Sequence, residues 1–423
     1  MIPLEWGELE DLGLGELRGR PADGVVRRVH DDSRDARAGD LFVALNTGTR
    51  FVDDALERGA ATLVPADQET ALAALAGLVR DRSDAAVVAV VGSTGKTTTK
   101  DALAALCAAV TPTVAADASR NNELGLPLTV LRLEPETRVL VTEMGMRGIG
   151  QIAELCRVAR PTLALVTSIG PEHLELVGSL EDVARANAEA LDALPDGGVA
   201  VVPADEALLE PYLRPALDVR RFDPATVRRE NGAWRYEVGG TELVLELPFT
   251  QRHLAENVLA ALTAYDALGL PLGRAVEGAR SIALSRWRGE VASLPGGGLV
   301  VNDAYNANPT SMRAALRDLA ERAVGRRRVA ILGEMAELGA ESGRYHAEVG
   351  DLAGELGIEL VIGVGEPARA YLAHADGFVV EDATAFDRIA ASLRPGDAIL
   401  VKGSRSVGLE GIPTLIQKHS RAW

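Results

Sequence analysis

The chain alternates short apolar runs with longer amphipathic stretches. Between residues 85 and 203, the continuous runs AVVAVV, RVLVTE, TLALVTSI and GGVAVVP are separated by segments with apolar residues at helical spacing. Apolar strands that alternate with helices are typical of a parallel sheet covered on both faces. The pattern therefore predicts an α/β domain in the middle of the chain.

The flanking segments follow different patterns. Residues 234–247, WRYEVGGTELVLEL, alternate like a β-hairpin, and residues 253–269 predict a helix closed by a glycine cap. After SRWRGE, strands and helices alternate again over about 130 residues, the size of an ordinary domain. The N-terminal residues mix short strand-like and helical runs. We expect an α/β protein with three domains at residues 1–84, 85–289 and 290–423.

Composition and charge narrow the possible partners. The chain of 423 residues is 47% hydrophobic and has a formal net charge of -17, so its overall field repels nucleic acid and anionic membranes. The first 20 residues lack a basic segment followed by an apolar core, and no run of about 18 apolar residues occurs, so we expect neither a signal peptide nor a membrane span. Cys107 and Cys156 lack a C-x-x-C partner, which favours a reducing cytoplasm over a disulfide framework. A monomer is the default expectation.

The segment VVAVVGSTGKTTTKDAL at residues 87–103 resembles a phosphate-binding loop, because it follows an apolar strand and opens a helix. Val90 stands where the usual pattern has its first glycine. Backbone amides would bind phosphate oxygens, Lys96 would reach the β and γ phosphates, and the Thr97 hydroxyl would be a Mg²⁺ ligand. Only four of the 44 basic residues are lysines, which favours this role over a surface lysine beside a glycine turn. The nucleotide-binding candidates are Gly92, Ser93, Thr94, Gly95, Lys96, Thr97 and Thr98.

Two further candidates follow other strands of the same predicted sheet. Glu143 ends the run RVLVTE, where another Mg²⁺ ligand is expected; the alternative is a carboxylate that caps the following turn. His173 follows TLALVTSI, although a single histidine is also a common structural residue. Both are candidate metal ligands, because folds of this kind bind ligands at the carboxyl ends of their strands.

Eight motifs occur in the order found in the Mur ligases, the ATP-dependent amide-forming enzymes of peptidoglycan synthesis. They are GSTGKTT, RNNELGLPLTVLRL, TEMGM, the His173 segment, HLAEN, NDAYNANPTSM, ILGEMAELG and VKGSR. The last three resemble the branch that joins D-alanyl-D-alanine to UDP-N-acetylmuramoyl-tripeptide. The resemblance implies a small mixed α/β domain for the UDP-sugar peptide, a central P-loop ATPase-type domain and a C-terminal Rossmann-like domain that closes over ATP.

The resemblance also implies roles for individual residues. Lys96 would serve the phosphates, Arg288 would contact them from the closing domain, and D-alanyl-D-alanine would be the amine substrate. Mg²⁺ would be held by Thr97 and Glu143 at a first site and by His173 at a second. The remaining implied contacts are Asn257 and Asn306 to adenine, Asp303 to ribose, Ser33 and Arg34 to the uridine nucleotide, Asn121 and Asn122 to the UDP-sugar peptide, and Lys402, Ser404 and Arg405 near the amine.

Two positions depart from the family pattern. After DLFVAL the family reads G-x-x-x-D-G-H-x-F, whereas this chain reads NTGTRFVDDAL, which is shorter and lacks the histidine. Asn187 stands 14 residues after His173, where the family has a lysine that carbon dioxide converts to a carbamate ligand of the second Mg²⁺. An amide is neutral, so we expect weaker binding of that metal and activity independent of carbon dioxide. Glu189 could compensate, and the alternative for Asn187 is a solvated helix residue.

The expected reaction transfers the γ-phosphoryl group of ATP to the peptide carboxylate, and the amine then attacks the acyl phosphate. No residue is an evident base for that amine. Three alternatives remain: another Mur-type or folylpolyglutamate-type ligase, a plain phosphate-loop ATPase or kinase, and a catalytically silent homologue.

Overall fold

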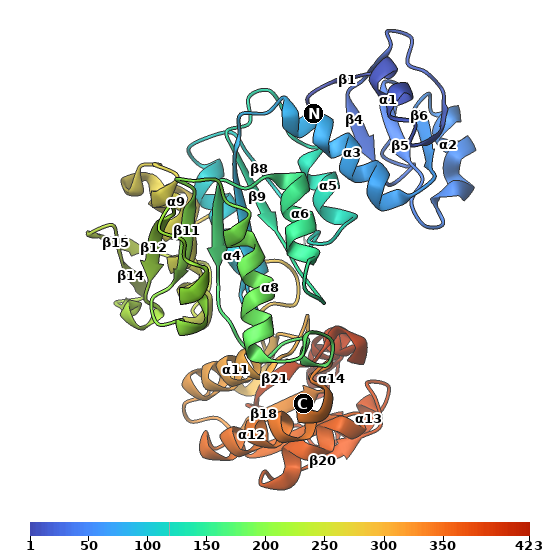
Figure 1. The fold of residues 1–423 in the computed structure, drawn as a ribbon. Helices are drawn as coiled ribbons and strands as arrows, with labels where there is room; N and C mark the ends of the chain where they lie inside the picture. Colours follow the sequence, from blue (N-terminus) through green and yellow to red (C-terminus); the bar gives the residue numbers. More distant parts are fainter. Residues whose placement is uncertain (118) are drawn as a thin grey trace. The chain divides into compact units, whose positions relative to one another are not determined.

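The central part of the computed structural model is a parallel sheet, as the apolar runs predict. Within residues 1–117 and 119–423, which the structure describes, its six strands have the order β12-β11-β10-β7-β9-β8. They are β7 (Ala86–Val91), β8 (Thr113–Ala115), β9 (Val139–Glu143), β10 (Leu163–Val166), β11 (Val199–Pro203) and β12 (Asp218–Phe222). The connecting helices include α4 (Lys96–Ala108), α5 (Gly125–Val130), α6 (Gln151–Ala159) and α8 (Leu180–Asp192) (Figure 1).

The strand order explains where a site can form. β7 pairs with β9 on one side and with β10 on the other, and both pairings are parallel. The chain therefore changes direction across the sheet at β7, which is the position where open α/β sheets bind ligands. Val87 to Val91 are fully buried, because a strand covered by helices on both faces has no solvent side. The segments that follow β7, β9 and β10 meet at one edge.

The N-terminal residues form a smaller mixed sheet in the order β2-β6-β5-β4. Its strands are β2 (Gly15–Arg18), β4 (Arg28–His30), β5 (Asp40–Val43) and β6 (Ala61–Pro65). The strand β2 runs antiparallel to β6, and the other pairings are parallel. Helix α2 (Val52–Glu57) packs on β6 of this sheet, whereas α3 (Gln68–Asp81) packs against α5 and α6 of the central part. Phe42 and Val52 belong to the core of the N-terminal part.

The C-terminal residues form a second six-stranded sheet with the order β16-β17-β21-β18-β19-β20 in the described part of the chain. Its strands are β16 (Glu290–Ser293), β17 (Leu299–Asn302), β18 (Arg328–Gly333), β19 (Leu360–Val364), β20 (Gly377–Val380) and β21 (Ala398–Lys402). Only β16 is antiparallel to its neighbour among these described strands. The helices include α11 (Pro309–Arg322), α12 (Ser342–Glu355) and α14 (Ile412–His419).

Contacts within the chain define two compact units. The first contains the N-terminal and central sheets and comprises Met1–Ser168, Arg185–Pro248 and Glu256–Ala283. The second contains the C-terminal sheet and comprises Ile169–Ala184, Phe249–Ala255 and Leu284–Trp423. The predicted domain boundaries at residues 84 and 289 stay a prediction.

Two predicted elements outside the large sheets are confirmed. The hairpin forms between β14 (Ala233–Val238) and β15 (Thr241–Leu245). Helix α9 (Arg252–Ala267) is followed by Gly269 with φ +70, the left-handed conformation expected of a glycine cap. A search of the described residues found no helix with the length and apolar character needed to cross a membrane.

Candidate active site

The phosphate loop lies between β7 and α4, as its sequence context predicts. Gly95 has φ +87, and a Cβ atom at this position would lie 2.4 Å from Oδ1 of Asn257. Only glycine fits here, because a side chain would collide with Asn257 and would also be strained by the positive φ. The structure thus brings Asn257, a predicted adenine contact, against the loop.

The first three amides of the loop are used within the protein. The Gly92 N–H donates to Asn187 Oδ1 at 2.7 Å, and the Ser93 N–H donates to the Ser168 carbonyl at 2.8 Å. The Thr94 N–H donates to Ser168 Oγ at 3.0 Å. Because these three N–H groups are engaged within the protein, we expect a phosphate to bind at the start of α4, from Gly95 onward, where helix N–H groups have no intrahelical acceptor. Contacts of Gly92, Ser93 and Thr94 with ATP stay a prediction.

Lys96 is folded back onto the loop in this structure. Its ammonium group donates to the carbonyl oxygen of Gly92. The lysine would have to turn away from this carbonyl to reach a bound phosphate. The adjacent Thr97 is buried, with 2% of its surface exposed, and starts α4 together with Thr98.

Glu143 is the most informative side chain near the loop. It ends β9 beside Val90 of β7 and is 1% exposed. Its Oε1 accepts a hydrogen bond from Asn121 Nδ2 at 2.8 Å, while Oε2 is buried without a hydrogen-bond partner in the part of the chain that the structure describes. Burying an unpaired carboxylate oxygen costs free energy, so this environment fits a residue that binds a cation. The predicted turn-capping alternative has no support here, because the recorded partner of Glu143 is the side chain of Asn121.

Two residues of α8, Asn187 and Glu189, have surroundings that differ from the expected ones. Asn187 is 1% exposed, so the alternative of a solvated helix residue is wrong. The carboxylate of Glu189 accepts hydrogen bonds from the Gly150 N–H and from the Ala153 N–H, the latter at 2.9 Å. Glu189 therefore satisfies the free amides at the start of α6, which contradicts the expectation that it compensates at a metal site.

His173 belongs to the second unit and contacts a residue of the ILGEMAELG motif there. Its Nδ1 lies against a carboxylate oxygen of Glu337. The backbone supports this pairing, because the Glu175 N–H donates to the Glu337 carbonyl at 3.1 Å. Coordination of Mg²⁺ by His173 stays a prediction.

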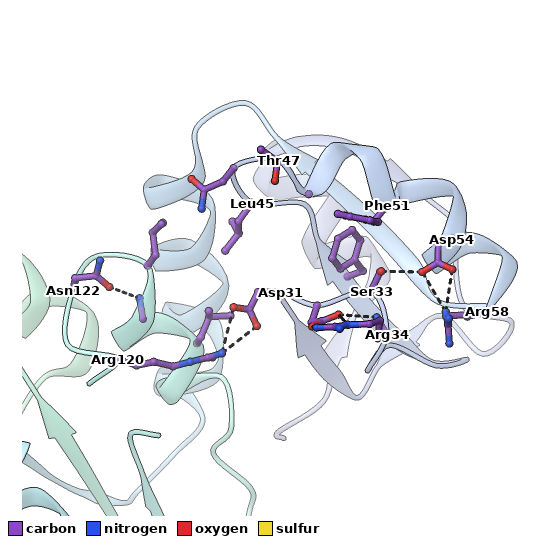
Figure 2. Close-up of a pocket in the computed structure, with 17 residues that line it drawn as sticks. Asp31, Ser33, Arg34, Leu45, Thr47, Phe51, Asp54, Arg58, Arg120 and Asn122 are labelled. Atoms are coloured by element: carbon purple, nitrogen blue, oxygen red, sulfur yellow. Dashed lines mark hydrogen bonds and ion pairs between the residues drawn. The ribbon is translucent and has the colours of Figure 1, made fainter. Parts of the chain in front are cut away.

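A separate pocket of about 800 Å³ lies in the first unit and is lined by residues of the N-terminal sheet and of the segment before α5 (Figure 2). Ser33, Arg34 and Asn122 all line it, as the predicted substrate contacts should. Asn121 does not, because it faces Glu143 instead. The pocket also contains residues that the sequence reasoning missed, among them Phe51, Asp54, Arg58 and Arg120.

Each arginine of this pocket has an aspartate partner. Arg34 pairs with Asp32 at 2.5 Å, and this hydrogen-bonded guanidinium lowers the pKa of the Asp32 carboxyl to about 2. Arg58 lies 3.3 Å from Asp54, whose carboxylate also accepts from Ser33 Oγ at 2.8 Å.

The pocket is also bridged between its two sides. Arg120, which precedes α5, lies 3.3 Å from Asp31 of the N-terminal domain. The guanidinium groups are exposed enough to exchange an aspartate for a phosphate, and Arg is well suited to bind either group.

In the second unit, the predicted nucleotide and amine contacts cluster at the carboxyl ends of β17 and β21. Lys402 is 3% exposed, and its Nζ donates to Asp303 Oδ2 at 2.6 Å and to the Asn306 carbonyl at 2.9 Å. Ser404 Oγ accepts from the Ala336 N–H at 2.9 Å. Lys402 and Ser404 therefore hold loops in place, whereas the Asn306 side chain is exposed.

Two arginines of this unit stack on aromatic rings. The guanidinium of Arg288 lies 4.0 Å from the ring centre of Tyr305, and that of Arg405 lies 4.3 Å from the ring centre of Trp287. Such cation–π contacts orient an arginine. The Arg405 guanidinium also lies 3.1 Å from a carboxylate oxygen of Glu410. Direct contacts of Arg288 with phosphate and of Arg405 with the amine stay predictions.

A phosphate loop on a parallel sheet, joined in one chain to a Rossmann-like sheet, is typical of a nucleotide-dependent enzyme. The chain belongs to the Mur ligase family. The Mur ligase middle domain model matches residues 90–265, and the Mur ligase, glutamate ligase domain model matches residues 287–405. The relative from Escherichia coli (strain K12) is named UDP-N-acetylmuramoyl-tripeptide--D-alanyl-D-alanine ligase. It is 34% identical over 99% of both chains. The relative of the same name from Bacillus subtilis (strain 168) is 31% identical over 92% of both chains.

Solved structures agree with this assignment. A crystal structure of MurF from Acinetobacter baumannii has a TM-score of 0.85 at 28% identity and covers 98% of this chain and 99% of its own. MurF from Thermotoga maritima in complex with ADP has a TM-score of 0.79 at 25% identity, covering 94% and 98%. The predicted three-domain α/β architecture is confirmed.

Proposed function

We propose that this protein is an ATP-dependent ligase that joins D-alanyl-D-alanine to UDP-N-acetylmuramoyl-tripeptide, with ADP and phosphate as the other products. The observation that carries the proposal is the juxtaposition of the phosphate loop with Glu143, a buried carboxylate that has an unpaired oxygen beside the loop strand. The curated relatives are named for this reaction.

Mg²⁺ fits the residues present. Thr97 and Glu143 offer a hydroxyl and a carboxylate oxygen, the hard donors that Mg²⁺ prefers, and Oε2 of Glu143 lacks any other partner among the described residues. When bound, the ion would neutralise charge on the transferred phosphoryl group. A second Mg²⁺, with His173 as a ligand, would serve the same charge neutralisation. We expect this ion to bind weakly because Asn187 supplies no charge.

Lys96 and the loop amides would do most of the positioning. ATP would displace the Lys96 ammonium from the Gly92 carbonyl, and the freed group would then neutralise the β and γ phosphates. The peptide carboxylate attacks the γ-phosphorus, and ADP leaves. The amine of D-alanyl-D-alanine then attacks the acyl carbon, phosphate leaves, and the surplus proton of the amine is lost.

The pocket of Figure 2 would hold the UDP end of the peptide substrate. Arg34 and Arg58 supply donors for the diphosphate once they release their aspartates, and Ser33 is in place as a polar contact. Phe51 is 51% exposed although it is a large apolar side chain at the pocket, which suits stacking on the uracil ring.

The second unit would complete the nucleotide site. Asn306 and Asp303 would contact adenine and ribose beside Asn257, and Arg288 would reach the phosphates. Lys402 and Ser404 would shape the surroundings of the amine, and Arg405 would lie near it. A monomer in the cytoplasm is part of the same proposal.

The test is ADP release by the purified protein with ATP, Mg²⁺ and UDP-N-acetylmuramoyl-tripeptide, with and without D-alanyl-D-alanine. Release that depends on D-alanyl-D-alanine supports the ligase, and Lys96→Met is the inactive control. Release that is equally fast without any amine would instead identify a plain ATPase. Release that requires a different amino acid would identify another ligase of the Mur or folylpolyglutamate type.

A further inference from the structure

The first residue of the phosphate loop is held by a hydrogen bond from a distant part of the chain. Gly92, the first loop residue after β7, has φ +123 and donates its N–H to Oδ1 of Asn187 on α8 at 2.7 Å. Asn187 is 95 residues further along the sequence and is 1% exposed. A buried backbone N–H is costly to leave unpaired, so this contact constrains the loop.

Gly92 needs such a constraint for a steric reason. A Cβ atom at this position would lie 2.3 Å from Thr167 Oγ1 and 2.9 Å from the Ser168 N atom, so only glycine is tolerated. Glycine, however, has the widest choice of backbone conformations and loses the most entropy when it is fixed. An acceptor outside the loop selects one of these conformations.

The orientation of the Gly92 residue is coupled to Lys96. The Gly92 N–H donates to Asn187, and the Gly92 carbonyl oxygen accepts from the Lys96 ammonium. On the other side, Thr167 Oγ1 donates to the Thr94 carbonyl at 2.6 Å, which fixes the middle of the loop against the end of β10. The loop is thus clamped at Gly92 by α8 and at Thr94 by β10.

We infer that Asn187 is a positioning residue of the phosphate loop, one that holds the Gly92 amide so that the loop from Gly95 onward is preorganised for ATP. This inference rests on the proposed use of ATP. In this role the side-chain oxygen of Asn187 accepts a hydrogen bond from the Gly92 N–H, which requires neither a charge nor a carbamate. The hydrogen bond also suits an asparagine. A lysine ammonium at this position has only N–H donors and could not accept the Gly92 N–H.

The test compares three variants of the full-length protein. Asn187→Leu has a similar size but no acceptor, Asn187→Asp keeps an acceptor, and Glu189→Gln alters a residue of the same helix that contacts α6 instead of the loop. ADP affinity is measured by calorimetry with Mg²⁺, and KM for ATP, KM for the UDP-sugar peptide and kcat are measured separately. Calorimetry needs no acid or amine substrate, so it separates failure of this inference from failure of the proposed reaction.

We expect Asn187→Leu to weaken ADP binding and raise KM for ATP by about 10-fold or more, the effect of one lost hydrogen bond, with KM for the UDP-sugar peptide unchanged. Asn187→Asp should restore most of the affinity, and Glu189→Gln should leave it unaltered. Unchanged ADP affinity in Asn187→Leu, or an equal loss in Glu189→Gln, would overturn the inference. If Asn187→Leu does not fold, Asn187→Ala takes its place, because it also lacks the acceptor and the same affinities can be compared.

Discussion

Glu143 is a buried carboxylate with too few hydrogen-bond donors around it. Its carboxylate is 1% exposed, and in the described part of the chain one oxygen has a single donor, Asn121, while the other has none. Buried charges in proteins are normally paired or bound to a metal. The residue therefore destabilises the free protein and becomes favourable when a cation is present.

Glu143→Gln should act in opposite directions on stability and on activity. Without metal, removal of the buried charge should raise the melting temperature, because the unpaired carboxylate is replaced by a neutral amide. Turnover should fall about 100-fold or more because a Mg²⁺ ligand is lost. Thermal unfolding in EDTA and ADP release in Mg²⁺ measure the two effects, with Glu189→Gln as control. A lower melting temperature in EDTA would contradict this account of Glu143.

Asn187 leads to a second prediction, about carbon dioxide. An asparagine amide cannot form a carbamate, so the rate in carbon-dioxide-depleted buffer should equal the rate with added bicarbonate. The Mg²⁺ concentration needed for half-maximal rate should be high, because no anionic ligand occupies this position. Strong stimulation of the wild-type enzyme by bicarbonate that is absent in Asn187→Ala would refute this expectation.

At the scale of elements, the ILGEMAELG loop is held by a histidine of α12. His346 is fully buried, its Nε2 accepts from the Met335 N–H at 3.0 Å, and its Nδ1 lies 2.7 Å from the Ser342 carbonyl. These partners require a neutral ring with the proton on Nδ1. Burial lowers the pKa of His346 below its usual value, although the hydrogen bond to the Ser342 carbonyl and the nearby Glu334 oppose the shift.

Stability should therefore fall in mild acid. A histidine whose pKa is lower in the folded state contributes fully above its unfolded pKa of about 6.5, and the contribution is lost as the pH falls below that value. We expect the melting temperature of the wild type to drop more steeply between pH 7.5 and pH 5.5 than that of His346→Gln, which keeps an acceptor but does not titrate. Parallel pH profiles of the two proteins would argue against a role for His346.

Phe51 and Arg58, which directly precede and follow helix α2, line the pocket and belong to no family motif. Phe51→Ala and Arg58→Met should each raise KM for the UDP-sugar peptide about 10-fold, through lost stacking and lost phosphate contact respectively. KM for ATP should stay constant, because the pocket that these residues line contains no residue of the phosphate loop. Arg50→Met, a change of the neighbouring residue that does not line the pocket, is the matched control. Equal effects on both KM values would contradict the assignment.

The elements that the sequence predicted are those with strong apolar patterns. β7, β9 and β10 are continuous buried runs, so their type and order could be predicted. The strands β8 and β12 escaped prediction because one has three residues and the other, DVRRF, is largely polar at the sheet edge. Their pairing is determined by tertiary contacts and leaves little local signal.

In the site, too, residues with a local sequence signal could be predicted, whereas contacts between distant segments could not. The positions of Lys96 and Glu143 follow from strand ends and a loop motif, and the structure brings their strands together. The contacts of Ser168 and Asn187 with the loop join segments 74 and 95 residues away, which no local pattern reveals. Phe51 and Arg58 were missed because the motif around them has diverged.

At the scale of the whole molecule, the residues assigned to one nucleotide occur in both compact units. Lys96 and Asn257 belong to the first unit, whereas Arg288, Asp303 and Asn306 belong to the second. Catalysis by positioning requires all of these groups to reach the same ATP. A change in the arrangement of the units on binding is the expected consequence, because closure of domains commonly completes such sites and excludes water.

Small-angle scattering tests this closure directly. A nonhydrolysable ATP analogue with Mg²⁺ and the UDP-sugar peptide should reduce the radius of gyration, and either ligand alone should have a smaller effect, because each leaves part of the site unfilled. Lys96→Met should bind the UDP-sugar peptide but fail to contract with the nucleotide, which separates closure from general compaction by ligands. A radius of gyration that is unchanged under saturating ligands would mean that the free protein is already closed or that the nucleotide is bound by the first unit alone. The second result would contradict the shared site, and Arg288→Ala separates the two: a raised KM for ATP would mean that the closed arrangement exists before ATP binds, whereas an unchanged KM would mean that the first unit binds ATP alone.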